Sequence, residues 1–200
     1  MNLSLLPRPL TDVEVSELLH AASDTREALR DRAIVALLID AGPSRSELVR
    51  LVHSDYDPDD GVISIGVGES SRRVPLGRIS GAAIDALVNG GGLPTAPLLR
   101  SRSGVPVTDR AVHELLCRLS AAGELGFVAT CRHTRRTWLH WVLQAFPGPV
   151  VARLANHHPA RMPRATSEEA LAVLLEIGWI SPLDRALADP TLADMSRHAA

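Results

Sequence analysis

Three arginines lie close together in the segment RHTRRT at residues 132–137. In a helix, Arg132, Arg135 and Arg136 share one face because residues three and four apart are neighbours. A guanidinium group offers a fixed fork of N–H donors that suits bidentate binding of phosphate or carboxylate. Because Arg135 also heads an apolar stripe, we expect its side chain to point inward or into a cleft. Its partner is then either a phosphate or an internal group, such as Glu47 or a backbone carbonyl.

Histidines and a cysteine surround this segment, but their spacing matches no recognised zinc pattern. They are Cys131, His133, His140, His157 and His158. We therefore expect no metal and no cofactor. His133 and His158 are expected to be solvated, whereas His157 is either a phosphate donor or a hydrogen-bonded core histidine.

The segment Gly66-Val-Gly68 joins two short apolar runs instead of preceding a helix, so it predicts a hairpin turn and not a dinucleotide-binding loop. Trp138 and Trp141 lie at helical spacing. Because aromatic residues make up only 3% of the chain, we interpret both as structural and not as a platform for stacked bases.

The composition is that of one globular domain: 200 residues, 46% of them hydrophobic, with a formal net charge of −2. All 21 basic residues are arginine, and Tyr56 is the only tyrosine. The bulk charge does not favour a dedicated nucleic-acid-binding domain, but the clustered arginines favour a local positive face. With two cysteines, no basic leader before an apolar run and no apolar stretch of membrane-spanning length, we expect a cytoplasmic protein with free thiols and no membrane partner.

The pattern predicts a mainly α-helical fold with one small antiparallel hairpin. An extended leader occupies residues 1–10, and a capping box at Thr11 and Glu14 starts the first helix. The predicted helices are 12–22, 26–41, 44–52, 79–88, one capped by Thr108, 133–146, 149–156 and 168–177. The predicted strands are 62–65 and 73–76.

Four segments in this order resemble the catalytic domain of the tyrosine recombinase (phage integrase) family. DRAIVALLIDAG at 31–42, with SEL at 46–48 and SD at 54–55, is similar to the family pattern RDxxLLxLLxxTGLRxSELLxLxxSD. GVG at 66–68 and RRVPL at 72–76 match GKGxKxRxVPL. RHTRRT at 132–137 lies where the family has HxLRHT, and LANH at 154–157 lies at its LLGH box. The resemblance implies that residues 11–166 form a catalytic-type domain followed by a helical tail, residues 167–200.

The resemblance also implies how the family's chemistry maps onto this chain. Two arginines and a histidine hold the scissile phosphate, a lysine protonates the leaving oxygen, and a tyrosine attacks phosphorus. The first arginine position holds Ser44 and the lysine position holds Val67. The nucleophile position holds Thr166. The family histidine and second arginine fall on Arg132 and Arg135, and the later histidine on His157.

Three neighbours are candidates to replace the lost groups: Arg45, His133 and Ser167. Arg45 is rotated by one helical step from the first arginine position, which disfavours it. Tyr56 falls where an apolar residue normally packs, so we expect it to be structural. The family's N-terminal DNA-clamping domain is expected to be missing, because the resemblance begins near Leu10.

We therefore expect a catalytically inactive tyrosine-recombinase-like protein that binds double-stranded DNA in an accessory or regulatory role. Its phosphate contacts would be Arg135, Arg132, His157, Arg72 and Arg73. A second hypothesis is an enzyme that uses the same pocket for different chemistry on a small anionic molecule. A third is a structural protein that self-associates, or binds a protein partner, through Ser167–Ala200.

Overall fold

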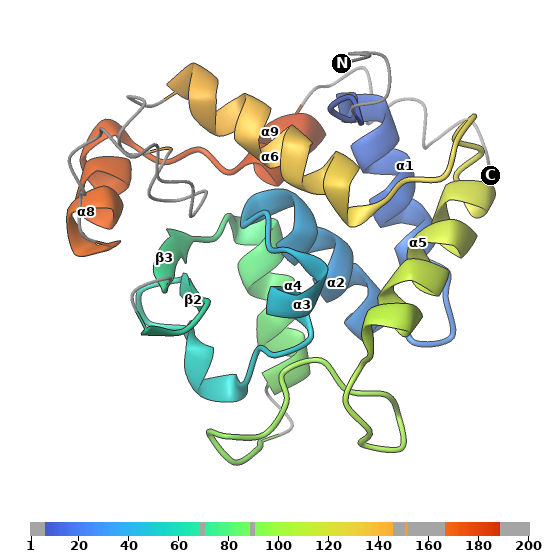
Figure 1. Ribbon diagram of the computed structural model, residues 1–200, viewed down its shortest axis with the longest axis horizontal. Helices are drawn as coiled ribbons and strands as arrows, with labels where there is room; N and C mark the ends of the chain where they lie inside the picture. Colours follow the sequence, from blue (N-terminus) through green and yellow to red (C-terminus); the bar gives the residue numbers. More distant parts are fainter. Residues whose placement is uncertain (1–6, 69–70, 89–90, 146–150, 152–166, 189–200) are drawn as a thin grey trace.

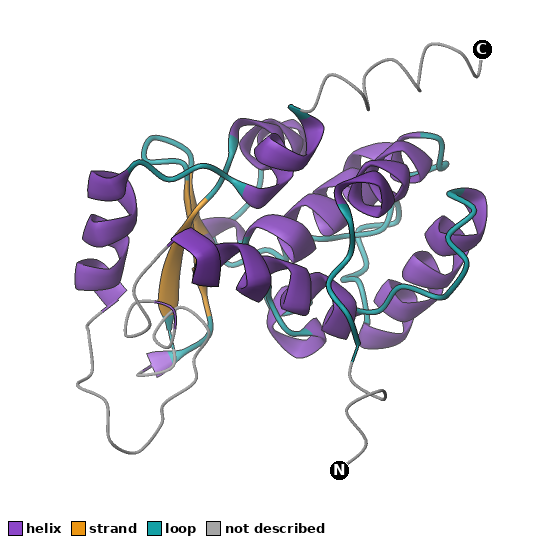
Figure 2. Ribbon diagram, turned by 90° about the horizontal axis from the view of Figure 1, so that it is seen from above, coloured by secondary structure: helices purple, strands orange, loops and turns teal. Residues whose placement is uncertain are grey.

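The computed structural model describes residues 7–68, 71–88, 91–145, 151 and 167–188. Helices make up most of it, and the strands gather at one end (Figures 1 and 2). The central element is α2 (Ala28–Asp40), which packs against α1 (Asp12–Ser23), α4 (Arg78–Val88) and α6 (Cys131–Ala145). Every residue of α2 from Ala33 to Ile39 is buried, which explains why this run is apolar on all sides.

The small sheet has three antiparallel strands in the order β1-β2-β3. They are β1 (Tyr56–Asp57), β2 (Val62–Ile65) and β3 (Arg72–Pro75), with Ile63 opposite both Tyr56 and Val74. The short helices α3 (Arg45–Leu48) and η2 (His53–Asp55) lead from α2 into the sheet. The helix α8 (Ser167–Ile177) packs beside β3, away from the helical end of the molecule (Figure 1).

Sequence signals account for the helix boundaries. At α1, the Thr11 side chain accepts the N–H of Glu14, while the Glu14 carboxylate accepts the N–H of Thr11. Thr108 caps α5 (Asp109–Ala122) in the same way at the Ala111 N–H. At the end of α2, Gly42 has a φ of +54°, and a Cβ there would lie 2.6 Å from Cε3 of Trp138. Glycine is required here because the backbone is left-handed and the Trp138 ring fills the space.

The last described helix, α9 (Pro182–Leu187), is held by the hydrogen bonds of two aspartates, Asp40 and Asp184. Asp40, at the end of α2, accepts hydrogen bonds from the Ser181 hydroxyl at 2.7 Å and the Leu183 N–H at 2.8 Å. It also accepts from the Ser80 hydroxyl and the Gly77 N–H, both near the start of α4. In return, Asp184 of α9 accepts the Arg78 and Ile79 N–H groups. These bonds join α2, α4 and α9 into one unit.

The sequence predicted the fold class and most elements, with local errors. The helix predicted at 44–52 ends after one turn at Leu48, and η2 follows a break. The strand β1 and the helix α9 were not predicted, since both are too short to show a period. The strand predicted at 73–76 begins one residue earlier, and the helix predicted at 149–156 lies outside the described residues apart from Val151.

Candidate functional site

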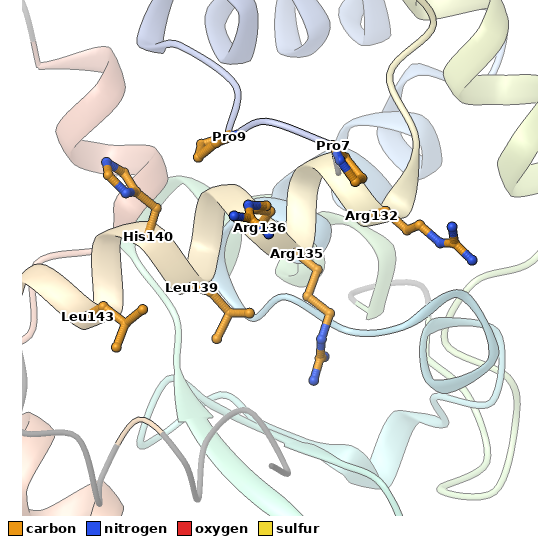
Figure 3. Close-up of a pocket in the computed structure, with 8 residues that line it drawn as sticks. All are labelled: Pro7, Pro9, Arg132, Arg135, Arg136, Leu139, His140 and Leu143. Carbon is orange, nitrogen blue, oxygen red and sulfur yellow. The ribbon is translucent and has the colours of Figure 1, made fainter. Parts of the chain in front are cut away.

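The arginine cluster lies on α6, as its spacing predicts (Figure 3). Arg132 and Arg136 are exposed, whereas Arg135 is only partly exposed. The three side chains border a hollow of about 650 Å³. Its remaining walls are Pro7, Pro9, Leu139, His140 and Leu143. The arginines therefore form a real surface feature that is open to a ligand.

Arg135 is held by internal partners. Its Nη1 donates to the Gly42 carbonyl at 2.5 Å and lies 3.7 Å from Oε2 of Glu47. Burial and the nearby charge of Arg72 lower the pKa of Arg135. Both internal partners expected for this side chain, Glu47 and a backbone carbonyl, are present, so Arg135 fixes the end of α2 against α6.

Glu47 is the acidic residue that contacts Arg72 and lies near Arg135. It caps α3 by accepting the Ser44 N–H at 2.6 Å, and it accepts Nη1 of Arg72 at 2.6 Å. Burial alone would raise the pKa of Glu47, but the hydrogen bond and charge of Arg72, together with the Ser44 contacts, lower it to about 2. The carboxylate is therefore ionised at neutral pH; it pairs with Arg72 and lies close to Arg135.

Arg72 is not placed as a surface contact for DNA. Its side chain is 0% exposed and its guanidinium is paired with Glu47, so it cannot reach a phosphate on the protein surface. The prediction that Arg72 contacts DNA is corrected, because β3 turns alternate side chains to opposite faces and Arg72 lies on the buried face. Arg73, on the other face, is partly exposed and lies 3.5 Å from Asp60.

Ser44 and Val67 are the two positions at which the resemblance implies lost catalytic groups. The Ser44 hydroxyl accepts the Glu47 N–H and completes the capping box of α3. Val67 lies in the hairpin turn with 77% of its surface exposed. Arg45 projects toward α5, where its Nε lies 3.7 Å from Asp109. A second hollow, of about 670 Å³, is bordered by Ser44, Arg45, Asp109, Arg135 and others.

The only tyrosine is part of the core. Tyr56 is 7% exposed, and its hydroxyl donates to Asp85 at 2.9 Å. Burial, with the adjacent Asp85, raises the pKa of Tyr56 to about 12. A phenol that is buried and hard to ionise is a poor nucleophile, so the structural interpretation of Tyr56 agrees with the contacts. Trp138 is likewise fully buried, and Trp141 packs at the core and lies under the Arg185 guanidinium.

His133 is half-buried, which corrects the expectation that it is solvated. The Thr130 N–H, just before α6, donates to Nδ1 of His133 at 3.2 Å, and the Thr130 hydroxyl lies 2.8 Å from the same nitrogen. His133 thus caps the Thr130 N–H, which is one half of a capping box, whereas the His133 N–H bonds to the Thr130 carbonyl and not to its hydroxyl. A backbone N–H can only donate, so Nδ1 must be unprotonated for the contact to exist.

We expect this cap to weaken in acid. Burial, and then the charge of Arg8, lower the pKa of His133, while Glu14 acts in the opposite direction. A lowered histidine pKa means that the unfolded chain binds more protons, so stability is present above about pH 6.5 and declines below it. His133→Gln, which keeps an acceptor, should show a smaller loss of melting temperature between pH 7.5 and 5.5 than the native chain.

The matched control is His140→Gln, because His140 is exposed on the same helix. Equal pH slopes for the native chain and both variants, measured by thermal denaturation in circular dichroism, would contradict the role of His133.

Several predicted site residues cannot be placed. His157 and Thr166 lie outside the described residues, as does the side chain of Ser167. Among the residues that the structure describes, no group of three or more metal-ligating side chains comes together. In the same part of the chain, no helix is long and apolar enough to cross a membrane.

Sequence reasoning missed the walls of the first hollow. Pro7 and Pro9 precede the first helix in the sequence but lie against α6 in space (Figure 3). The Leu10 N–H donates to the Thr137 hydroxyl at 2.8 Å, which fixes the segment there. The only signal was the alternating proline pattern, which indicates an extended strand but not its partner.

Comparison with known proteins agrees with this geometry. A sequence model of the phage integrase family matches residues 8–165. The chain belongs to the phage integrase family. This integrase-family chain is 33% identical over 117 residues to tyrosine recombinase XerC of Xylella fastidiosa, which covers 58% of the chain and 40% of the relative. It is 45% identical over 73 residues to tyrosine recombinase XerA of Thermococcus kodakarensis, covering 36% of the chain and 25% of the relative. The chain thus spans less than half the length of these relatives.

Solved structures show the same fold. The integrase-family chain superposes on a XerA recombinase with a TM-score of 0.69 at 20% identity, over 98% of this chain and 66% of that one. It also superposes on the Tn1549 transposon integrase in complex with transposon right end DNA, with a TM-score of 0.63 at 20% identity, over 84% and 65%. A lambda integrase dimer bound to a core site gives 0.62 at 17% identity, over 81% and 62%. The fold is that of a tyrosine recombinase catalytic domain.

Proposed function

We propose that this chain is a tyrosine-recombinase-like protein that binds double-stranded DNA but does not cleave it, and that it acts in an accessory or regulatory role in DNA recombination or integration. The observation that carries the proposal is a contrast between the tyrosine, which is buried, and the arginines of α6, which are exposed. Tyr56, the only tyrosine, is buried on Asp85, whereas α6 still presents exposed arginines beside an open hollow.

The missing groups support the inactive part of the proposal. The chain has no lysine to protonate a leaving oxygen, and the tyrosine position of the family pattern holds Thr166. A threonine hydroxyl has a far higher pKa than a phenol and needs an activating base. Incubation with a nicked suicide duplex, followed by denaturing electrophoresis, tests this directly. No covalent adduct is expected, and an adduct would overturn the inactive assignment.

The exposed arginines support DNA binding. Arg132 and Arg136 can neutralise phosphates without breaking an internal contact that the structure shows, whereas Arg135 also holds Gly42 and Glu47. Arg132→Ala with Arg136→Ala should therefore weaken binding to all duplex sequences alike and lower the salt slope of the affinity by about two units. Fluorescence anisotropy at several salt concentrations measures both quantities.

The control for this pair is Arg110→Ala. Arg110 is exposed on α5 and is paired with Glu114, away from the hollow. If the control weakens binding as much as the α6 pair, the arginine face is not the contact surface. If the native chain binds no duplex at low salt, DNA binding is wrong.

A second candidate function rests on the hollow of about 670 Å³ between α3, α5 and α6. Its volume is that of an ordinary small-molecule site, and Arg45 and Arg135 border it. An enzyme that acts on a small anion would use this space. A chain that binds inorganic phosphate or a metabolite here and has no affinity for DNA would favour this candidate over the first.

A further inference from the structure

The hollow on α6 combines two kinds of surface that a DNA backbone alone does not need. One kind is cationic, supplied by Arg132, Arg135 and Arg136, and the other is apolar. The apolar side chains are Pro7, Pro9, Leu139 and Leu143. In Figure 3 the two prolines lie across α6 from the two leucines, and Arg136 lies between them.

The proline wall is held in place on both sides. Next to Pro7 and Pro9, the Arg8 guanidinium is paired with Glu14 and lies 4.8 Å from the centre of the Phe127 ring. One residue further on, the Leu10 N–H donates to the Thr137 hydroxyl. Because proline also restricts its own backbone, the wall is preformed and pays little ordering entropy when a ligand binds.

The leucine wall is open to solvent. Leu143 is 60% exposed, although it lies one helical turn from Leu139 and borders the same hollow. The phosphates of a DNA backbone are charged, and the deoxyribose edges between them offer such a side chain only a small apolar surface. A DNA base offers such a side chain a flat apolar face, and the phosphate of the same nucleotide lies one sugar away. Bases that leave the stack are typically held between apolar side chains and guanidinium planes.

We propose that this hollow binds a nucleotide of DNA whose base has left the helical stack, with the base between the proline and leucine walls and its phosphate on Arg132 and Arg136. The inference rests on the proposed DNA binding and names the kind of DNA that is preferred. The volume of about 650 Å³ lies within the range that small-molecule sites occupy. The chain should thus select duplexes with an unpaired nucleotide over fully paired ones.

The test uses three end-labelled duplexes of one sequence: fully paired, with one unpaired nucleotide, and with an abasic sugar at the unpaired position. The abasic duplex keeps the extra phosphate and the flexibility but lacks the base. We expect the full-length chain to bind the duplex with the unpaired base more tightly than the other two, on the order of tenfold, in anisotropy titrations at fixed salt.

Two neutral substitutions locate the effect. Leu143→Gln makes the wall polar without changing the charge and should reduce the preference to less than about threefold. Leu29→Gln is the matched control, because Leu29 on α2 is also 60% exposed and does not border the hollow. It should keep the full preference. Circular dichroism melting curves confirm that both variants fold.

The outcomes separate the two proposals. Equal and measurable affinity for all three duplexes overturns this inference and leaves DNA binding intact. The same preference for the abasic duplex also overturns it, because flexibility and not the base would then be recognised. A preference that Leu143→Gln leaves unchanged places the base elsewhere and overturns it too. No binding to any duplex at low salt overturns both proposals.

Discussion

Glu47→Ala is expected to lower the free energy of unfolding by about 3–5 kcal/mol, because it strands a buried cation. The Arg72 side chain is 0% exposed, and Glu47 is the acid to which it is paired. The same substitution removes the cap of α3 at the Ser44 N–H and the anion near Arg135. Since natural domains have about 5–15 kcal/mol in total, the variant should be marginally stable or unfolded. Urea denaturation followed by circular dichroism measures the change.

A double-mutant cycle shows whether the ion pair is the cause. Arg72→Met in the Glu47→Gln background removes both charges and fills the site with an apolar side chain of similar length. We expect this double variant to be more stable than Glu47→Gln alone, since an apolar replacement of a buried pair is often neutral or better. A double variant that loses the sum of the two single losses would argue against coupling.

The pH dependence of stability provides an independent check on Glu47. Its pKa is about 2 in the folded chain against 4.5 as the reference value, a difference equivalent to about 3 kcal/mol. A depressed carboxyl pKa gives stability that is fully present above about pH 4.5 and is lost as the pH falls toward 2. The Glu47→Gln variant should therefore lose less stability than the native chain over this interval, measured by urea denaturation at each pH.

Asp40→Ala is expected to have an effect of similar size, about 3–5 kcal/mol, through loss of four hydrogen bonds at one buried carboxylate. The donors come from α4 and α9, and Asp40 itself is 0% exposed. Without it, the Ser181 hydroxyl and the Leu183 N–H lose their acceptor. We therefore expect α9 to detach before the rest of the domain unfolds.

Limited proteolysis between α8 and α9, and tryptophan fluorescence, follow this detachment. Trp141 lies 4.8 Å from the Arg185 guanidinium of α9, so its environment changes when α9 leaves. Asp24→Ala is the control, because Asp24 is an exposed acid at the end of α1. Unchanged cleavage and emission in Asp40→Ala would show that α9 is held mainly by its apolar contacts.

The sequence predicted those parts of the fold that depend on local pattern. The capping box at Thr11, the apolar run of α2 and the apolar strand at 62–65 each leave a direct signal in the sequence, and all of these elements are present. The buried polar contacts leave a weaker signal in the sequence. Asp40 and Ser181 are 141 positions apart, and an aspartate in an apolar run does not reveal its partner.

The sequence predicted the helix that carries the candidate site, but it did not predict which residues line the pocket. Helical spacing alone placed Arg132, Arg135 and Arg136 on one face. Which of them is internally bonded depends on Gly42 and Glu47, which lie on other elements. The burial of Arg72 could have been inferred. Side chains alternate along a strand, so Arg72 lies on the same face as the apolar Val74, and Arg73 lies on the opposite face.

The reciprocal aspartates described above have a practical consequence for anyone who shortens this chain. Asp40 belongs to the innermost helix, but half of its donors come from residues near the far end of the sequence. A version cut before Ser181 would expose a carboxylate with two empty acceptor positions and would remove Asp184 from the start of α4. Any shortened version should therefore keep Ser181, Leu183 and Asp184.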